Sequence, residues 1–379
     1  MSGPTGKRRL LVISNGIGED SIGAEIVRRL PPGFEVEAYP TLGAGRHYEG
    51  VCRVVGPRAE LASQGSRVNR GTVTRDIATG GLATIPPGLA FMRRSREAYD
   101  HHLVIGDFIG VAGCWLSGIR NITYLDVYKT GYGRPYAVIE RWIIKRTCRA
   151  VFNRSERLAR ALAASGVDAR AAGNVMMDTI PSADYDAPRR RSRPLAVTLL
   201  PGSREQTAEN FALQIAALAG LPEPSRPDVF VAVADGIAID SLARAAGLQF
   251  SPPASAEAAD LGTLSGRGLA VHLARGAFGN LLAASDLVLS QAGTATIQAL
   301  GSGKPVITFT RPADRMKRFL EENRLFGAAR LLVPGEATAL ATAVRALLED
   351  PAEIARLGAI GRERIGGPGA IEAIIASLR

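Results

Sequence analysis

The amino-acid sequence predicts an α/β protein of the doubly wound class, in which parallel sheets are flanked by helices. In both halves of the chain, short apolar runs rich in Val, Ile and Leu alternate with segments of helical periodicity. A length of 379 residues exceeds a single ordinary core and indicates two domains. The segment DYDAPRRRSRP at 184–194 carries prolines and charge without periodicity, which is typical of a linker. We therefore expect an N-terminal domain over 1–186 and a C-terminal domain over 187–365, with a last helix near 366–379 that packs back on the first domain.

The first half opens with a strand, a loop and a helix, followed by further strands. The expected strands are 9–14, 35–39, 102–106, 121–125 and 150–153, and the expected helices are 22–30 and 155–164. Residues 56–100 have a less regular pattern, with a Gly-rich stretch before LATIPPGLAFMRR at 82–94. We interpret 82–94 as an ordinary loop and helix, and the alternative is a surface segment that enters a bilayer with its basic pair at the headgroups.

The second half repeats this alternation. Its expected strands are 195–200, 228–233, 269–272, 287–290 and 305–309, and its expected helices are 210–218, 279–284, one that follows Gly293, 351–360 and 370–378. Thr294 is expected to cap the helix that follows Gly293, because Thr is a favoured N-cap residue.

Composition and charge narrow the classes of function. An apolar content of 46% with 22% charged residues is that of a globular protein, and no apolar run reaches the length of a membrane span. A formal charge of +10 favours an anionic partner, although an arginine-rich composition can also reflect coding bias. No zinc-finger spacing, RNA-binding signature or aromatic-basic repeat is present, so we expect no nucleic-acid partner. The 3 cysteines lack metal-ligand spacing and the N-terminus lacks a signal-peptide core, so we expect a cytoplasmic protein without a metal site.

The loop NGIGED at 15–20 follows the first strand as a dinucleotide-binding turn would. The third glycine of that fingerprint is replaced by Ser21, and Glu19 and Asp20 would repel a pyrophosphate. We therefore exclude a nucleotide at this loop. Two acids at a helix N-terminus are stabilised by the helix dipole, which is a sufficient structural reason for them. The functional alternative is that they face a cleft and bind or activate a hydroxyl-bearing ligand.

Asp107 follows the apolar run HLVIG at 102–106. The carboxyl end of a parallel strand lies on the ligand side of such sheets, so Asp107 is a candidate general base. The structural alternative is that its carboxylate caps the next helix.

Two turns in the second half lack acidic side chains at their centres and suit anions. One is PGSRE at 201–205, where Gly202, Ser203 and Arg204 offer backbone, hydroxyl and guanidinium donors. The other is SQAGTATIQ at 290–298, where a strand, a small-residue turn and a helix N-terminus follow one another. An ordinary strand-to-helix turn is the competing interpretation of each.

These two turns, with LLPGSRE at 199–205 and SQAGTATIQAL at 290–300, resemble the paired signatures of lipid-A-disaccharide synthase, a glycosyltransferase of the GT-B fold. The opening SNGIGEDSIGAEI at 14–26 is more similar to a divergent branch, the lipid-A-disaccharide synthase-related proteins. The resemblance implies two Rossmann-like domains whose parallel sheets face each other across a cleft, and a UDP-sugar held mainly by the C-terminal domain. It places the diphosphate near Gly202, Ser203 and Arg204 and at the helix start.

The resemblance implies that the residues at this helix start contact the UDP-sugar donor. They are four small residues and one amide, namely Gly293, Thr294, Ala295, Thr296 and Gln298. Gln298 stands where the family usually has glutamate, and its amide can still bond a ribose hydroxyl. The family's opening Ala-Ser-Gly-Asp is replaced by Gly-Ile-Gly-Glu-Asp.

The leading hypothesis is an inverting, metal-independent transferase that moves a GlcNAc-type or related sugar from UDP to a lipid-linked or amphiphilic hydroxyl. Asp107, or in its place Glu19 or Asp20, would deprotonate the acceptor, which the loop of Asn15, Gly16 and Gly18 would contact. No cofactor is expected beyond the UDP-sugar substrate. The alternatives are a UDP-sugar 2-epimerase of the same fold and a non-catalytic sugar-nucleotide or lipid-binding protein.

Membrane association is a separate expectation. The charge of +10 and the apolar-basic segments 82–94 and 136–149 suit a peripheral site on the inner face of the cytoplasmic membrane, with an anionic lipid surface as partner. A helix half buried in a protein core has a similar composition.

Overall fold

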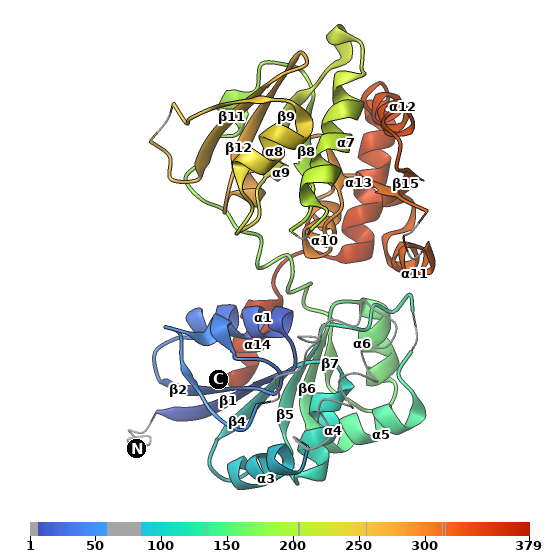
Figure 1. Cartoon of the computed structure of the whole chain (residues 1–379). Coiled ribbons are helices and arrows are strands. Elements are labelled where there is room, and N and C mark those ends of the chain that lie inside the picture. Colours follow the sequence, from blue (N-terminus) through green and yellow to red (C-terminus); the bar gives the residue numbers. More distant parts are fainter. Residues whose placement is uncertain are drawn as a thin grey trace. The chain divides into compact units, whose positions relative to one another are not determined.

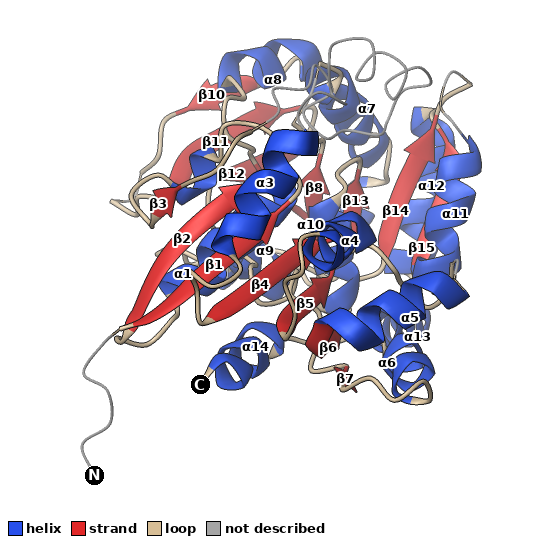
Figure 2. Cartoon of the chain, turned by 90° about the horizontal axis from the view of Figure 1, so that it is seen from below, coloured by secondary structure: helices blue, strands red, loops and turns tan. Residues whose placement is uncertain are grey.

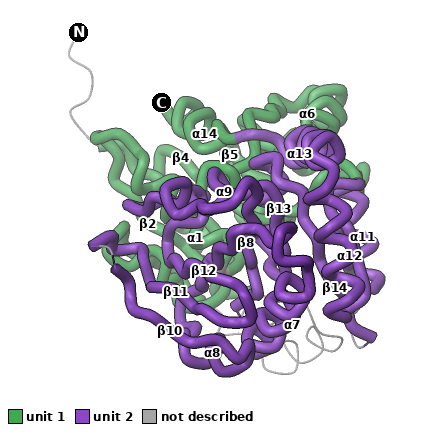
Figure 3. The backbone as a smooth tube through the Cα atoms, turned by 90° about the horizontal axis from the view of Figure 1, so that it is seen from above, with its two compact units in different colours: residues 1–179, 368–379 green, residues 180–367 purple. Residues whose placement is uncertain are grey.

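The computed structural model describes residues 7–58, 85–133, 135–203, 205–254, 256–312, 314 and 316–379. Its contacts divide the chain into two compact units (Figures 1 and 3). Unit 1 consists of Met1–Thr179 and Pro368–Arg379, and unit 2 of Ile180–Gly367. The α/β prediction is confirmed in both units, and each is described separately.

Unit 1 is built on a seven-stranded sheet in which every neighbouring pair is parallel, in the order β3-β2-β1-β4-β5-β6-β7 (Figure 2). The strands are β1 (Arg8–Ser14), β2 (Phe34–Pro40), β3 (Arg53–Val54), β4 (His101–Gly106), β5 (Ile122–Asp126), β6 (Cys148–Asn153) and β7 (Ala169–Arg170). The central strands are buried on both faces, which explains their continuous apolar runs.

Helices cover both faces of this sheet. The helices of unit 1 are α1 (Ile17–Arg28), α3 (Ile85–Ser95), α4 (Phe108–Leu116), α5 (Val138–Thr147), α6 (Glu156–Ala163) and α14 (Ala370–Leu378), with a 3-10 turn η1 at Arg46–Tyr48. Leu10 and Val12 of β1 share a core with α1 and α14. Leu11 and Ile13 point to the opposite face and share a core with α3, α4, α5 and α6.

Unit 2 contains an eight-stranded sheet in the order β10-β11-β12-β9-β8-β13-β14-β15. The strands are β8 (Ala196–Leu200), β9 (Asp228–Ala232), β10 (Gln249–Ser251), β11 (Asp260–Gly266), β12 (Leu269–Ala274), β13 (Leu287–Ser290), β14 (Val306–Thr310) and β15 (Arg330–Pro334). The pairs from β12 to β15 are parallel, whereas β11 is antiparallel to both β10 and β12.

The helices of unit 2 are α7 (Thr207–Ala219), α8 (Ile239–Ala246), α9 (Phe278–Ala284), α10 (Thr294–Gly301), α11 (Met316–Phe326), α12 (Ala337–Leu348) and α13 (Pro351–Ile365), with 3-10 turns η3 (Pro188–Arg190), η4 (Glu223–Ser225) and η5 (Gly327–Ala329). The larger apolar core joins one face of the sheet to α7, α8 and α12. Phe230 of β9 points to the other face and packs with Leu281 of α9.

The division between the units falls after Thr179, whereas the sequence placed a boundary after residue 186. Tyr185 and Ala187 are buried and pack with Phe230 and Leu281, so the chain has already joined the core of unit 2 at these residues.

The chain returns to unit 1 through α14, which Figure 3 colours with that unit. Ile371, Ile374 and Leu378 are fully buried in its core. The carboxylate of Asp178 accepts hydrogen bonds from the backbone N–H groups of Gly369 at 2.6 Å and Ile371 at 3.0 Å. This carboxylate therefore satisfies donors at the N-terminus of α14 and fixes its start.

Two details of local structure differ from the sequence predictions. The first helix begins at Ile17 rather than at residue 22, so the acids of the opening loop lie within its first turn. The N-cap of α10 is Gly293, and Thr294 is the first helical residue with no side-chain capping bond, so the predicted capping role of Thr294 is wrong. Among the helices that the structure describes, none combines the length and hydropathy needed to cross a membrane.

Candidate functional site

Each sheet has a point at which the strand order reverses. In unit 1 the chain adds β2 and β3 on one side of β1, then returns to place β4 on the other side. In unit 2 it adds β9 beside β8 and later places β13 on the opposite side. In open α/β sheets, ligands bind at the carboxyl ends of the strands that flank such a reversal. Those predicted site residues that the structure describes lie at this position in each unit.

At the reversal in unit 1, Asn15 and Asp107 follow the adjacent strands β1 and β4 and contact each other. The Asn15 amide nitrogen donates to Asp107 Oδ1 at 2.7 Å, and the backbone N–H of Ile109 donates to the same oxygen at 2.9 Å. Asp107 is thus the N-cap of α4, and its side chain is half-buried. The carboxylate is held by its neighbours at the ligand side of the sheet.

Gly106 allows this contact. Its φ is +141°, and a Cβ built there would lie 1.9 Å from Asn15 Oδ1. Any side chain at Gly106 would therefore displace the Asn15 amide from Asp107.

The two acids of the opening loop are buried in the first turn of α1. Glu19 and Asp20 are 8% and 2% exposed. A Cβ built at Gly16 would lie 2.3 Å from Glu19 Oε2, so the Glu19 carboxylate folds back over the glycine. Gly18 remains exposed. The N-terminus of α1 therefore already holds carboxylates of its own chain.

Asp20 belongs to a polar cluster beneath this turn. Ser14 Oγ donates to Asp20 Oδ1 at 2.6 Å and lies 3.0 Å from the Tyr48 hydroxyl. Burial raises the pKa of Asp20 from 3.8 to about 6, the hydrogen bond from Ser14 lowers it in part, and the charge of Glu19 raises it further. Burial also raises the pKa of Tyr48, which stays a neutral phenol. Asp20 points into the protein, whereas the Asp107 side chain is half-buried.

A further buried carboxylate lies at the end of the next strand. Gly106 and Asp126 are register partners on β4 and β5, and Asp126 is 1% exposed. Its Oδ1 accepts the backbone N–H groups of Tyr128 at 2.9 Å and Lys129 at 3.0 Å, and its Oδ2 accepts the Tyr136 hydroxyl. Burial raises the pKa of Asp126, and these hydrogen bonds oppose that shift.

Sequence reasoning did not single out Asp126. The signal was the same as for Asp107, an acid directly after a buried apolar run. The polar network extends to β6, where Asn153 donates from its side-chain amide to the Tyr136 hydroxyl at 2.8 Å.

In unit 2, the PGS turn follows β8. Gly202 has φ +105°, a conformation that favours glycine, and Ser203 is exposed. The Asn210 side chain of α7 donates to the carbonyl of Pro201 at 2.8 Å and braces the turn. Arg204, predicted as the guanidinium partner of a diphosphate, lies outside the described residues.

The second turn follows β13, the direct neighbour of β8, with Ser290 opposite Leu200. The backbone N–H of Gln291 donates to Leu200 O at 2.8 Å, and its side chain donates to Phe309 O at 2.8 Å, so the turn is tied to the strands on both sides. The two turns therefore lie at the same edge of the sheet. This brings Gly202 and Ser203 to the same side as the start of α10.

The five residues predicted to contact the sugar-nucleotide donor at the start of α10 differ in exposure. Gly293 and Thr294 are exposed and Ala295 is half-buried. Thr296 Oγ1 donates to Ala292 O at 2.6 Å and lies 2.6 Å from Ser290 Oγ, so it stabilises the turn from inside. Gln298 is 5% exposed. No acidic side chain is present in the first turn of α10.

Comparison with known proteins gives the fold. No protein-family model matches the chain, and no curated protein matches it. A putative UDP-N-acetylglucosamine 2-epimerase from Listeria monocytogenes has a similar structure, with a TM-score of 0.59 at 16% identity over 99% of this chain and 96% of that one. The calicheamicin glycosyltransferase CalG4 gives a TM-score of 0.60 at 14% identity over 98% of both chains.

A UDP-GlcNAc 2-epimerase from Neisseria meningitidis, solved bound to UDP-GlcNAc, gives a TM-score of 0.54 at 15% identity over 98% of this chain and 99% of that one. Similarity at this identity and over this length concerns architecture. The chain therefore has the two-domain α/β architecture of the GT-B fold, as predicted.

Proposed function

We propose that the protein is a UDP-sugar-dependent enzyme that transfers a sugar to a hydroxyl of a lipid-linked or amphiphilic acceptor. The observation that carries the proposal is the contrast between the two strand reversals. In unit 2, the turn after β8 presents Ser203, and the turn after β13 leads into a helix whose first turn has no acid, which suits a diphosphate. In unit 1, the same position presents the carboxylate of Asp107.

The chemistry follows from these groups. Asp107 accepts the proton of the acceptor hydroxyl, and the oxygen attacks the anomeric carbon on the face opposite to UDP, which inverts the configuration. Ser203 and the N–H groups at Gly293 and Thr294 stabilise the charge that develops on the departing UDP. Arg204 is proposed to add a bidentate contact. This distribution of donors requires no metal ion.

Asp107→Asn tests the role of the base. Asparagine retains the helix-capping oxygen and the partner for Asn15, so folding should be preserved. We expect the rate of transfer to fall roughly 100- to 10,000-fold while UDP affinity, measured by calorimetry, stays unchanged. Glu97→Gln, on a side chain that is 80% exposed, is the matched control. Full turnover by Asp107→Asn would disprove the assignment, and lack of UDP binding by the wild type would disprove the function itself.

A UDP-sugar 2-epimerase is the second candidate, because the structural neighbours named above include two 2-epimerases. The two activities differ in their need for an acceptor. Incubation with UDP-GlcNAc alone, followed by NMR of the sugar, gives the 2-epimer only if the protein is an epimerase. UDP binding with neither conversion nor transfer to any component of a lipid extract would indicate a binding protein.

We also propose that unit 1 binds an anionic membrane through the outer faces of α4 and α5, here called the α4–α5 surface. Its exposed apolar side chains are Ile109, Leu116, Val138, Ile139 and Trp142, with exposures of 63%, 54%, 75%, 59% and 41%. Exposed Lys145 and Arg146 lie on the same helix, and the Arg146 guanidinium is 4.1 Å from the Trp142 ring centroid. Apolar side chains with adjacent cations are typical of interfacial binding.

The other predicted apolar-basic segment contributes less. Residues 82–84 lie outside the described part of the chain, and the rest forms α3, whose Met92 is buried in the core. This supports the interpretation of 85–94 as an ordinary helix.

Co-sedimentation with vesicles that contain phosphatidylglycerol tests the α4–α5 surface. We expect binding at low salt, loss of binding in Ile139→Asp, and no loss in Leu320→Asp, which is 57% exposed on α11 of unit 2. Equal sedimentation of all three proteins would rule out this surface.

A further inference from the structure

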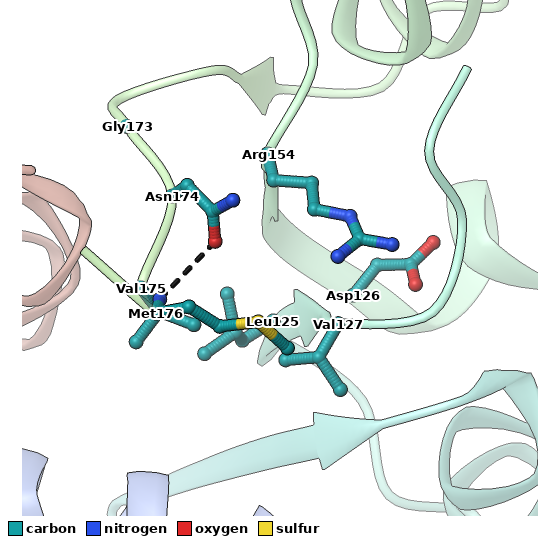
Figure 4. A pocket seen from close by; sticks show the side chains of 8 residues that line it. All are labelled: Leu125, Asp126, Val127, Arg154, Gly173, Asn174, Val175 and Met176. Atoms are coloured by element: carbon teal, nitrogen blue, oxygen red, sulfur yellow. Dashed lines mark hydrogen bonds between the residues drawn. The ribbon is translucent and has the colours of Figure 1, made fainter. Parts of the chain in front are cut away.

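A shallow pocket lies at the carboxyl edge of the sheet of unit 1, beside β5 and β6 (Figure 4). Its wall contains two charged side chains, Asp126 and Arg154, and its other lining residues are Leu125, Val127, Gly173, Asn174, Val175 and Met176. The Gly173–Asn174 turn forms one side, and Gly173 has φ +119°. Among these lining residues, only Asp126 was described above, together with its hydrogen bonds. The others have not been assigned a role.

The Arg154 guanidinium is held in a fixed position. Its Nε donates to the carbonyl of Lys129 at 3.3 Å, and its Nη2 donates to that of Tyr128 at 3.1 Å. Figure 4 shows the side chain extended along the pocket wall beside Asp126. Two carbonyl oxygens orient the guanidinium but do not neutralise its charge.

Arg154 has no carboxylate partner in the part of the chain that the structure describes. The neighbouring acid, Asp126, directs both oxygens to other groups, namely the backbone of Tyr128 and Lys129 and the hydroxyl of Tyr136. The ammonium of Lys129 pairs instead with Glu140, at 3.0 Å. Among the described residues no hydrogen-bond partner is present for Arg154 Nη1, which therefore retains donor capacity.

This arrangement is costly without an anion. Burial lowers the pKa of Arg154, and the charge of Asp126 opposes this only in part. A partly buried cation that is oriented by carbonyls and lacks an ion pair gains most from a ligand that brings the missing negative charge. The planar fork of arginine fits the oxygens of a phosphate or carboxylate.

We propose that Arg154 forms an anion subsite in unit 1 that binds a phosphate monoester or similar group of a small ligand. Arg154 directly follows β6, whereas Asp107 follows β4, so two strand spacings of about 5 Å each separate them along the edge. A ligand of roughly 10 Å would reach both. If the proposed function holds, this ligand is the acceptor of the transferred sugar, and that assignment rests on the proposed function. The anion subsite at Arg154 does not depend on it.

The test compares phosphate binding in three proteins at constant ionic strength. Thermal unfolding is followed by the fluorescence of Trp115 and Trp142, the 2 tryptophans of the chain, which both lie in unit 1. Inorganic phosphate is titrated with and without saturating UDP, which occupies the diphosphate site of unit 2 if the proposed function holds. The proteins are the wild type, Arg154→Gln, and Arg160→Gln, which removes an equal charge from a side chain that is 82% exposed.

We expect phosphate to raise the unfolding temperature of the wild type and of Arg160→Gln. Arg154→Gln should require at least roughly tenfold more phosphate for the same rise. Arg154→Lys, which keeps the charge without the fork, should give an intermediate value and covers the case in which the glutamine variant does not fold.

The same phosphate dependence in wild type and Arg154→Gln would overturn the proposal. If the protein does not bind UDP but Arg154→Gln still weakens the response to phosphate, the proposed function is disproved and the anion subsite is supported. A response to phosphatidate vesicles but not to soluble phosphate would identify a lipid headgroup as the source of the anion.

Discussion

Burial of Asp20 predicts that unit 1 loses stability as the pH rises. Its pKa is raised from 3.8 to about 6 in the folded protein, so between these values the folded state binds a proton that the unfolded chain has lost. Stability therefore falls as the pH rises through this window, and the full penalty is present above about pH 6. A shift of about two units corresponds to about 3 kcal/mol, because each unit is worth about 1.4 kcal/mol.

Asp20→Asn removes the ionisation while retaining an oxygen that accepts the Ser14 hydroxyl. The free energy of unfolding is measured by urea titration at pH 4, 5.5 and 7. Fluorescence of Trp115 and Trp142 restricts the measurement to unit 1. The stability of Asp20→Asn relative to wild type should increase by about 2 to 3 kcal/mol between pH 4 and pH 7.

The control is Glu49→Gln, which removes one negative charge from the exposed surface of the same unit. Parallel pH profiles for wild type and Asp20→Asn would refute the reasoning. They would show that water reaches the carboxylate, or that the Ser14 bond outweighs burial.

Three further substitutions test the scaffold. Gly106→Ala should destabilise unit 1 by about 1 to 3 kcal/mol, because φ is +141° and the added Cβ would clash with the Asn15 side chain. Unfolding is followed by tryptophan fluorescence, and stability equal to wild type would contradict this expectation. Thr296→Val should remove the hydroxyl partner of buried Ser290, whose Oγ keeps only the bond from the Ala292 N–H, and should lower UDP affinity by about 1 to 3 kcal/mol in calorimetry. Unchanged affinity would show that the turn does not contribute to nucleotide binding. Ile374→Ala in α14 should cost about 2 to 5 kcal/mol of the unfolding free energy of unit 1, and a loss below 1 kcal/mol would show that α14 does not stabilise this unit.

The central parallel strands could be predicted from sequence because they are buried on both faces, whereas the parallel edge strands β3, β7 and β15 were not predicted. Runs such as LLVIS before Asn15 and HLVIG before Asp107 contain little but apolar residues, so their type and their ends are marked. The antiparallel strand β11 was not predicted. It contains Gly262 and Gly266 and is only partly buried, so neither composition nor alternation marks it.

Contacts between distant segments could not be predicted from local pattern. The predicted linker contains Tyr185 and Ala187, whose burial against β9 and α9 depends on tertiary packing. The pocket at Arg154 joins the ends of β5 and β6 to the turn at Gly173. A single arginine among 46 basic residues gives no sign in sequence that its charge lacks a partner.

The two strand reversals suggest why one fold can serve two kinds of ligand. A helix N-terminus favours a negative charge wherever it is formed, and the chain can supply that charge itself or leave it to a ligand. At α1 the chain supplies it, because Glu19 and Asp20 are buried in the first turn and the Glu19 carboxylate folds over Gly16. At α10 the first turn has no acid, and Gly293 and Thr294 are exposed. Thr294→Glu should therefore place a carboxylate of the chain itself at the N-terminus of α10. Calorimetry should then show weaker UDP binding at unchanged stability. Undiminished UDP affinity would show that the nucleotide does not bind at this helix start.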